Sequence, residues 1–534
     1  MKNILHILFL CALAMFAIAK PAYRGPLVRT MPDGSEKIVY MHGDECAHFI
    51  TDDEGRWLDE RTLEPMTDGA KALLQNRHNV AKARRAQEQT AAAPNIAPRG
   101  LVILINFQDL EFKTPRDTID SMLNAVNYTR KYSYMGRTAT GRLTRRTVTS
   151  QGSARQYFQD QSYGQYNPVF DVVGPVTVSQ KMSYYGENDA ASGNDKHPGE
   201  MIKEACQQAD ALGIDFAQYD NDNDKKVDFV YIIYAGYGEA DGGGDSTIWP
   251  HKYQLTYSGI SCILDGKRVD MYACGCEFNN TSKVYDGIGT FCHEFGHVLG
   301  LPDLYETNST SQGLHTLGNW DIMDYGPYNN DGNTPPSYSA YERFFMGWLT
   351  PRILTEPEYV TLAPINEGDG ESLMLVNGDR HNMIGYNPNP TTFYLLETRT
   401  KSGWDKPLTG PGMLITKIQY NSYRWMYNIV NNSASNMGVD ILEAKTNTSN
   451  GAKATDAYPA GATEWTGFSG HEVTDIIRNS NGSVSFSYRG AEKPIPEAID
   501  EVPMGGARCT KVLRNGQLYL LYKGQMYDVQ GRRF

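Results

Sequence analysis

The stretch from residue 290 to 303 limits the possible structures of this chain more than any other part of it. It places His293 and His297 four residues apart, so a helix would project both imidazoles from one face, one turn apart. Two imidazoles in that arrangement can bind one zinc ion, and Glu294 beside them can take a proton from a zinc-bound water. The sequence therefore predicts a catalytic zinc helix with Glu294 as the general base.

The residues after this helix predict a third zinc ligand. Gly300 can adopt the positive φ that ends a helix, and Pro302 prevents the helix from resuming. The reversed chain can return Asp303 to the metal and leave a fourth position open for water. Glu306, three residues further on, could replace Asp303, and the sequence alone leaves both residues open as the third ligand.

A second segment, from Gly318 to Gly326, follows the predicted zinc helix and contains Met323 and Tyr325. Its spacing is similar to that of metzincin peptidases, in which a tight turn presents a methionine beneath the zinc and some members carry a tyrosine two residues later. A tyrosine hydroxyl beside the metal can donate a hydrogen bond to the oxyanion that forms during catalysis. On that resemblance, Tyr325 is expected to be a second catalytic residue.

An aspartate-rich stretch at 220–228 predicts a separate calcium site. Oxygen side chains recur there at every second position, which allows the loop to wrap a hard cation. The pattern departs from EF-hand loops because Lys225 stands where glycine is usual and the distal bidentate glutamate is absent. The alternative is a solvated acidic turn. A structural calcium ion is expected to bind the backbone carbonyl of Lys226 and four carboxylates, those of Asp220, Asp222, Asp224 and Asp228.

Together these motifs resemble those of the immune inhibitor A family of secreted bacterial zinc metallopeptidases. The resemblance runs from about Arg99 to Gly490 and also includes Ile248-Trp249-Pro250-His251 and Phe393-Tyr394-Leu395-Leu396-Glu397. It implies a metzincin-like endopeptidase that acts on proteins or peptides. His251 is not among the predicted zinc ligands.

Residues 1–19 have the pattern of a secretory signal. Lys2 supplies a positive charge, residues 4–16 are mainly apolar, and Ala17-Ile18-Ala19 offers small residues for cleavage. The apolar run is too short for a comfortable membrane span, and no later stretch is long and apolar enough for one. The chain is therefore expected to be exported, either secreted or held at the cell surface, with no integral membrane span.

The rest of the chain divides into four predicted parts. Residues 20–98 indicate a propeptide that ends in a flexible linker. Residues 99–350 alternate strands and helices, which predicts an α/β catalytic domain with a twisted sheet. Residues 351–490 change to short strands with Gly, Asn and Pro turns, typical of an all-β, sandwich-like domain. Residues 491–534 resemble the C-terminal tails of exported bacterial proteins and could attach the protein to a cell surface.

A propeptide at residues 20–98 would make the chain a zymogen, an inactive precursor of the enzyme. Asp44 and Cys46 could cover the open zinc position, since carboxylate and thiolate both bind zinc, although either could simply pack in a strand. Pairing of the cysteines cannot be assigned from the sequence. Cys262 and Cys274 flank a hairpin-like segment, where a disulfide bridge and buried free thiols are both reasonable.

Composition narrows the classes of function. The net charge of −12 and the lack of a concentrated basic face argue against nucleic-acid binding. The main prediction is a secreted zinc endopeptidase that is made as a zymogen. The alternative is a non-catalytic, zinc-stabilised cell-surface binding protein, which is less favoured because closed structural sites normally have four protein ligands. Zinc chemistry also allows a non-peptide substrate such as a glycan, and only the family resemblance selects peptides.

Overall fold

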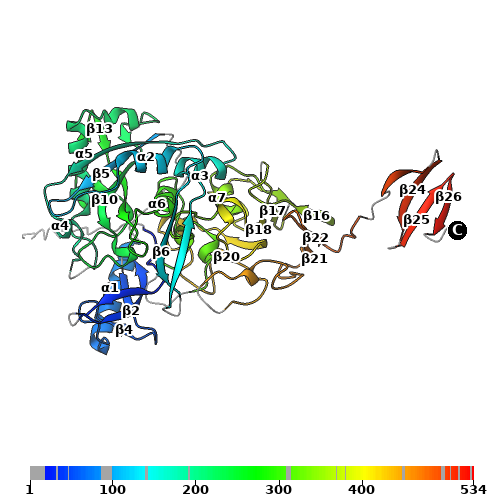
Figure 1. The fold of residues 1–534 in the computed structure, drawn as a ribbon, viewed down its shortest axis with the longest axis horizontal. Helices are drawn as coiled ribbons and strands as arrows, with labels where there is room; N and C mark the ends of the chain where they lie inside the picture. The colour runs from blue at the N-terminus through cyan, green and yellow to red at the C-terminus, as the bar shows by residue number, and fades with distance from the viewer. Residues whose placement is uncertain are drawn as a thin grey trace, which may run out of the picture.

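The computed structural model describes residues 19–534 apart from short gaps (Figure 1). The residues outside the description are 1–18, 32–33, 46, 86–98, 139–141, 190–192, 308–313, 369, 379–380, 448–450, 495–498, 505–506, 515–516 and 529–531. Nearly all of the predicted signal, the predicted linker and Cys46 therefore lie outside the described residues. Within the described part, none of the helices has the length and apolar character needed to cross a membrane.

A five-stranded sheet, called the central sheet below, forms the core of the part of the chain between residues 99 and 350, in the order β11-β14-β10-β5-β8. Four of its strands run parallel, and the edge strand β11 is antiparallel. Buried parallel strands are apolar on both faces, which is why residues 100–107 and 229–234 form nearly continuous apolar runs in the sequence. The strand bounds are β5 Arg99–Asn106, β8 Val169–Thr177, β10 Val230–Tyr237, β11 His251–Gln254 and β14 Met271–Phe278.

Helices cover both faces of this sheet. Val102 and Leu104 of β5 share a hydrophobic cluster with helix α6 (Gly289–Val298), whereas Leu101 packs on the other face with helix α5 (Pro198–Ala211). This alternation follows from the opposite directions of successive side chains along a strand. The arrangement is the α/β class that the sequence predicts for this region.

Further elements surround the central sheet. The other α-helices described before residue 350 are α1 Asp68–Arg85, α2 Arg116–Asn124, α3 Ala154–Gln161, α4 Met182–Gly186 and α7 Ala340–Phe345. A hairpin and a small sheet are formed by β6 Lys131–Arg137 with β7 Leu143–Thr149, and by β9 Lys226–Val227, β12 Ile263–Leu264 and β13 Lys267–Val269.

The chain becomes rich in β-structure after α7. One sheet has the order β15-β17-β18-β19-β20 and a second has the order β16-β22-β21, and residues of both share one hydrophobic cluster. Their bounds are β15 Arg352–Ile353, β16 Glu358–Leu362, β17 Leu373–Leu375, β18 Thr392–Arg399, β19 Gly412–Gln419, β20 Val439–Ile441, β21 Val473–Arg478 and β22 Val484–Tyr488, with helix α8 at Ser422–Met426. The tail forms a separate sheet of β23 Ile499–Met504, β24 Ala507–Arg514, β25 Gln517–Tyr522 and β26 Gln525–Asp528 (red in Figure 1).

The predicted propeptide forms a small sheet of its own against the central region (blue in Figure 1). Leu27 and Met41 from this sheet belong to a hydrophobic cluster that also contains Ala240 and Trp249. This small sheet thus packs, through an apolar contact, on the part of the chain that contains the five-stranded sheet. Its strands are β1 Leu27–Thr30, β2 Glu36–Asp44, β3 Ala47–Thr51 and β4 Trp57–Leu58.

The hairpin expected near Cys262 is present, because β12 and β13 pair in antiparallel fashion. Cys262 and Cys274 are both buried and free, so the disulfide reading of this segment is wrong and the buried-thiol reading is right. Both side chains belong to the apolar layer on the α5 face of the central sheet, where a thiol packs as a small hydrophobe.

Phe295 tests how strongly α6 depends on this core. The side chain is fully buried and its ring lies 4.9 to 5.3 Å from the rings of Phe158, Phe170 and Phe229. Phe295→Ala is expected to lower the free energy of unfolding by about 3–5 kcal/mol, as measured by denaturant titration. Leu212→Ala, at a side chain that is 65% exposed, should change it by no more than about 0.5 kcal/mol. Equal effects of the two variants would contradict this packing.

Candidate metal centre and active site

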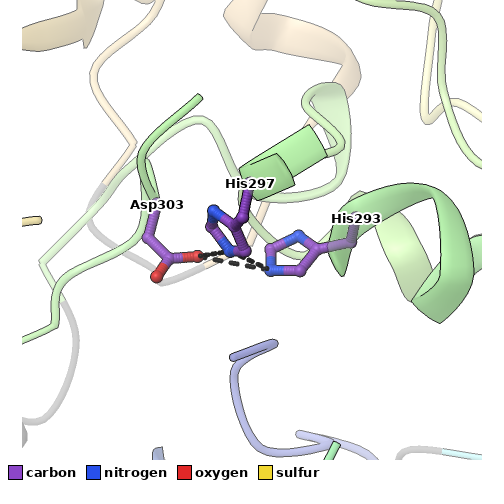
Figure 2. Close-up of side chains that lie close together, drawn as sticks. All are labelled: His293, His297 and Asp303. Carbon is purple, nitrogen blue, oxygen red and sulfur yellow. Dashed lines mark hydrogen bonds and ion pairs between the residues drawn. The ribbon is translucent and has the colours of Figure 1, made fainter. Parts of the chain in front are cut away.

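Helix α6 and the turn after it bring three side chains to one point. His293 and His297 project from one face of the helix, the chain turns at Gly300 with φ of +104°, and Asp303 then faces both rings (Figure 2). All three side chains are buried. Glu306, the other candidate third ligand, instead accepts a hydrogen bond from the backbone N–H of Leu314.

The distances within this triad fit a zinc ion. Nε2 of His293 and Nε2 of His297 are 3.2 Å apart, and Oδ1 of Asp303 lies 3.3 and 3.2 Å from them respectively. Tetrahedral zinc with bonds of about 2.0–2.2 Å places its ligand atoms about 3.3–3.6 Å apart. Oδ1 of Asp303 is buried and has no hydrogen-bond partner among the described residues. A cation between these three atoms would satisfy it.

Backbone carbonyls fix the tautomer of both histidines. Nδ1 of His293 donates to the carbonyl of Ile322 at 2.7 Å, and Nδ1 of His297 donates to the carbonyl of Leu301 at 2.8 Å. A carbonyl can only accept, so each Nδ1 carries the proton and each Nε2 presents a lone pair. The two lone pairs point at the position that a metal would take, as in histidine-ligated metal sites generally.

The charges in the triad support the same arrangement. Burial disfavours ionisation of Asp303, but the two imidazoles together hold its pKa well below the usual range. Burial lowers the pKa of His297 and favours the neutral ring that binds metals. A metal ion binds the ionised form of Asp303 and the neutral form of His297, and each of these two pKa directions favours the form that binds.

Asp303 is held from the β-rich part of the chain. Nδ2 of Asn428 donates to Oδ2 of Asp303 at 2.6 Å, and the N–H of Asp303 donates to Oδ1 of Asn428 at 2.7 Å. Nδ2 of Asn431 donates to the carbonyl of Leu304 at 2.7 Å. The segment around Asn428 therefore orients the carboxylate so that its other oxygen, Oδ1, faces the histidines.

Glu294 lies beside the triad and is covered by residues 19–24, which are called the N-terminal segment below. It is fully buried, and its Oε1 accepts a hydrogen bond from the backbone N–H of Lys20 at 3.0 Å. Burial raises the pKa of Glu294 well above its usual value, and the negative charge of Asp303 raises it further. A carboxylate of raised basicity is suited to accept a proton and pass it on.

The same segment binds the surrounding residues through its backbone. The carbonyls of Ala19, Lys20 and Pro21 accept hydrogen bonds from the side chains of Tyr305, Trp249 and Tyr328 at 2.5, 3.1 and 2.6 Å. Three successive carbonyls are thus bound much as an extended peptide would be. The contact with Glu294 is made by Lys20; Cys46, one of the two predicted latency residues, lies outside the described residues.

Met323 and Tyr325 lie close to α6 and to the N-terminal segment. A Cβ atom at Gly296, between the two histidines, would lie 2.7 Å from the sulfur of Met323, so only glycine allows this contact. The Tyr325 ring is covered by Arg24, whose Cζ lies 3.5 Å from the ring centroid. No direct contact between Tyr325 and the triad is observed among the described residues, so its catalytic role stays a prediction.

The predicted calcium loop is partly assembled. Asp220, Asp222 and Asp224 bring one carboxylate oxygen each within 4.8 Å of one another. Lys225 adopts φ of +72°, a conformation that usually requires glycine at this position of such loops.

Other contacts already use several of the predicted calcium ligands. Asp228 accepts a hydrogen bond from the backbone N–H of Asn221 at 2.8 Å, and Nζ of Lys267 lies 2.5 Å from Oδ2 of Asp220. Lys226 ion-pairs with Asp224 through its Nζ at 2.7 Å. Calcium binding stays a prediction.

Comparison with known proteins agrees with this geometry. Residues 89–349 match the family model of the immune inhibitor A peptidase M6 catalytic domain. This part of the chain belongs to the immune inhibitor A peptidase family. The predicted family resemblance is thereby confirmed, and zinc is the metal that this family implies for the triad. The M6 region carries a metallopeptidase catalytic domain.

Two curated relatives match over part of their length. Immune inhibitor A of Bacillus thuringiensis subsp. alesti is 33% identical over 217 residues, which cover 36% of this chain and 31% of the relative. Pre-pro-metalloprotease PrtV of Vibrio cholerae serotype O1 is 28% identical over 310 residues, which cover 51% of this chain and 33% of the relative. The matches thus span about a third of each relative's length.

Sequence reasoning missed two residues that contact this site, and both lie outside the matched range 89–349. Asn428 is 125 residues from Asp303 in the chain, and an isolated asparagine in a β-rich region carries no signal of such a role. Lys20 was expected only as the start of a propeptide. Its contact with Glu294, 274 residues away in the chain, depends on tertiary packing that no local sequence pattern indicates.

The contact between Asn428 and Asp303 predicts an effect on metal affinity. Asn428 has φ of +53°, so Asn428→Gly removes the amide without backbone strain. Loss of this outer partner is expected to weaken zinc binding by about 10- to 100-fold, measured by competition with a chelator. Asn436→Ala, at an exposed side chain of the same region, is the control and should leave the affinity unchanged. Equal affinity of the Asn428 variant and the parent chain would contradict the role.

Proposed function

We propose that this protein is a secreted, zinc-dependent endopeptidase that hydrolyses peptide bonds of protein substrates. The observation that carries the proposal is the convergence of His293, His297 and Asp303 on one point, with Glu294 next to His293 in α6 and close enough for the charge of Asp303 to act on it. Three protein ligands leave a tetrahedral metal one position for water or substrate, which is characteristic of catalytic rather than structural zinc. The M6 match supports peptides as the substrate.

Different residues would carry out proton transfer and the orientation of the metal ligands. When bound, zinc supplies Lewis acidity that polarises a carbonyl and acidifies water. Glu294 takes the proton from the attacking water and delivers it to the leaving nitrogen. The carbonyls of Ile322 and Leu301 hold the two imidazoles in their ligating orientation, and Asn428 does the same for Asp303. These groups are fixed before substrate arrives, so little reorganisation is needed.

We assign Met323 and Tyr325 metzincin-like roles. Met323 packs against α6 at Gly296, between the two ligand histidines, and so supports the helix beneath the metal position. Tyr325 is covered by Arg24 of the N-terminal segment. Departure of that segment would uncover its hydroxyl, which could then donate to the oxyanion during hydrolysis.

We also infer that the chain is made as a zymogen. Lys20 and Pro21 are bound through their carbonyls beside Glu294, and the nitrogen of Lys20 donates to an oxygen of the general base. These contacts do not need Ala19, so they remain when the signal expected at 1–19 is removed and Lys20 becomes the first residue. A substrate could not reach Glu294 while this segment is present. The relative named as a pre-pro-metalloprotease is consistent with a pro-form. Export would follow from the signal expected at 1–19, and the loop at Asp220 would hold a structural calcium ion.

The general base gives the first test of the function. Glu294→Ala is expected to abolish protein cleavage while the zinc content stays the same, because the three ligands are unchanged. Casein digestion by the activated chain, with and without a zinc chelator, measures the activity, and metal analysis measures the zinc. Full activity of the variant would overturn the mechanism. Absence of cleavage by the zinc-loaded, folded parent chain would overturn the peptidase assignment itself.

Latency gives a second test. Tyr328→Phe removes the hydroxyl that binds the Pro21 carbonyl and so weakens the covering segment by one hydrogen bond. The measured quantity is the ratio of the activity before cutting to the activity after a cut within residues 86–98. In Tyr328→Phe this ratio should be about fivefold higher than in the parent chain, which corresponds to ~1 kcal/mol. Tyr423→Phe, at a side chain 52% exposed, serves as the matched control. A chain whose activity is the same before and after cutting would contradict the zymogen.

A further inference from the structure

A buried acidic pocket lies next to Glu294. Asp241 and Asp286 are 2% and 7% exposed, and their carboxylates together with the sulfur of Cys276 lie within 4.8 Å of one another. Asp241 belongs to the short 3-10 helix η2 (Glu239–Asp241). Burial raises the pKa of the Cys276 thiol, so this group stays neutral and the two aspartates are the acidic groups of the cluster.

The side chain of Lys20 fills this pocket. Its Nζ donates to Oδ1 of Asp241 and to Oγ1 of Thr290, both at 3.0 Å, and the Thr290 hydroxyl donates to Oδ2 of Asp286 at 3.1 Å. Nζ also lies 4.9 Å from the ring centroid of Tyr328. Burial disfavours the ammonium charge, yet Asp241 and Asp286 together raise the pKa of Lys20 above its usual value. The pocket therefore binds a fully charged lysine side chain.

Without Lys20 the pocket would need another cation. Oδ2 of Asp241 is buried and has no hydrogen-bond partner among the described residues. Removing one member of a buried ion pair leaves an uncompensated charge, which is strongly unfavourable. Removal of the N-terminal segment would thus leave a preformed site, beside the general base, that favours a cationic side chain.

The backbone of Lys20 determines which substrate residue would enter. Its nitrogen is 3.0 Å from Oε1 of Glu294. During peptide hydrolysis, the glutamate delivers its proton to the leaving nitrogen, so that nitrogen must come within hydrogen-bond reach of the same carboxylate. The backbone nitrogen of Lys20 therefore lies at a position, relative to Glu294, that the leaving nitrogen of a substrate must also reach. The leaving nitrogen is that of the residue directly after the cleaved bond, and the side chain of that residue would enter the pocket.

We propose that Asp241 and Asp286 form a specificity pocket that selects a basic residue, lysine before arginine, directly after the cleaved bond. This inference rests on the proposed peptidase function and adds its substrate preference. Two oxygen acceptors converge on a single nitrogen, which suits a compact ammonium better than a planar guanidinium. Lys20 is then the internal ligand that occupies the pocket in the uncut chain.

Two matched peptides test the pocket in the activated chain. They are internally quenched peptides, identical except for lysine or its neutral isostere norleucine directly after the cleaved bond. The ratio of their kcat/KM values should favour lysine by about tenfold or more, since a charge-assisted hydrogen bond is lost with norleucine. Asp241→Asn should bring the ratio close to one. Asp245→Asn, at a partly exposed aspartate in the same loop region, should keep the parent ratio.

The outcomes separate the pocket from the peptidase. Chelator-sensitive cleavage with no preference for lysine, or a preference that survives in Asp241→Asn, overturns the pocket and leaves the peptidase intact. Absence of any chelator-sensitive cleavage by the parent chain overturns the peptidase and this substrate preference together. Use of a ratio makes the result independent of how much of each variant is folded.

A second measurement does not depend on activity. Lys20→Met in the uncut chain removes the ammonium but keeps most of the side-chain volume. The backbone N–H groups of Ala22 and Tyr23, which donate to Gly43 and Ala240, should then exchange with deuterium about tenfold faster or more, because the anchoring ion pair is lost. Lys71→Met, at a surface lysine, is the control. Unchanged exchange in Lys20→Met would show that the pocket does not bind the lysine, and would overturn the proposal.

Discussion

Two backbone carbonyls decide the chemistry of this site. The carbonyls of Ile322 and Leu301 take the Nδ1 protons of His293 and His297, so both Nε2 lone pairs face inward toward Oδ1 of Asp303. Three electron-rich atoms 3.2 to 3.3 Å apart repel one another unless a cation lies between them. The surrounding backbone holds this arrangement, and its distances fit three ligands of one tetrahedral zinc ion.

Three distant parts of the chain meet at this point. Helix α6 supplies the histidines, the β-rich region supplies Asn428 to orient Asp303, and the N-terminal segment covers Glu294. Each contribution depends on a different packing contact. The metal site therefore depends on how the predicted domains are joined, and the β-rich region has a direct part in it through Asn428.

The N-terminal segment compensates charge as well as covering the site. Glu294, Asp241 and Asp286 are buried close together, and such carboxylates are unfavourable without partners. The backbone N–H of Lys20 donates to Glu294, and its ammonium group donates to Asp241. The charge of the same ammonium group also interacts with Asp286. Lys20 thus compensates the charges of acidic groups that would otherwise be buried without a cationic partner.

The sequence by itself determined the local chemistry of this protein. The spacing of His293 and His297, the turn at Gly300 and the apolar runs of β5 and β10 are consequences of helix and strand periodicity, and each could be predicted from a few neighbouring residues. Tertiary structure alone decided that Asn428 orients Asp303 and that Lys20 reaches Glu294, because those contacts join residues far apart in the chain. It also decided that Cys262 and Cys274 stay free thiols, because the apolar layer on the α5 face of the sheet encloses both side chains.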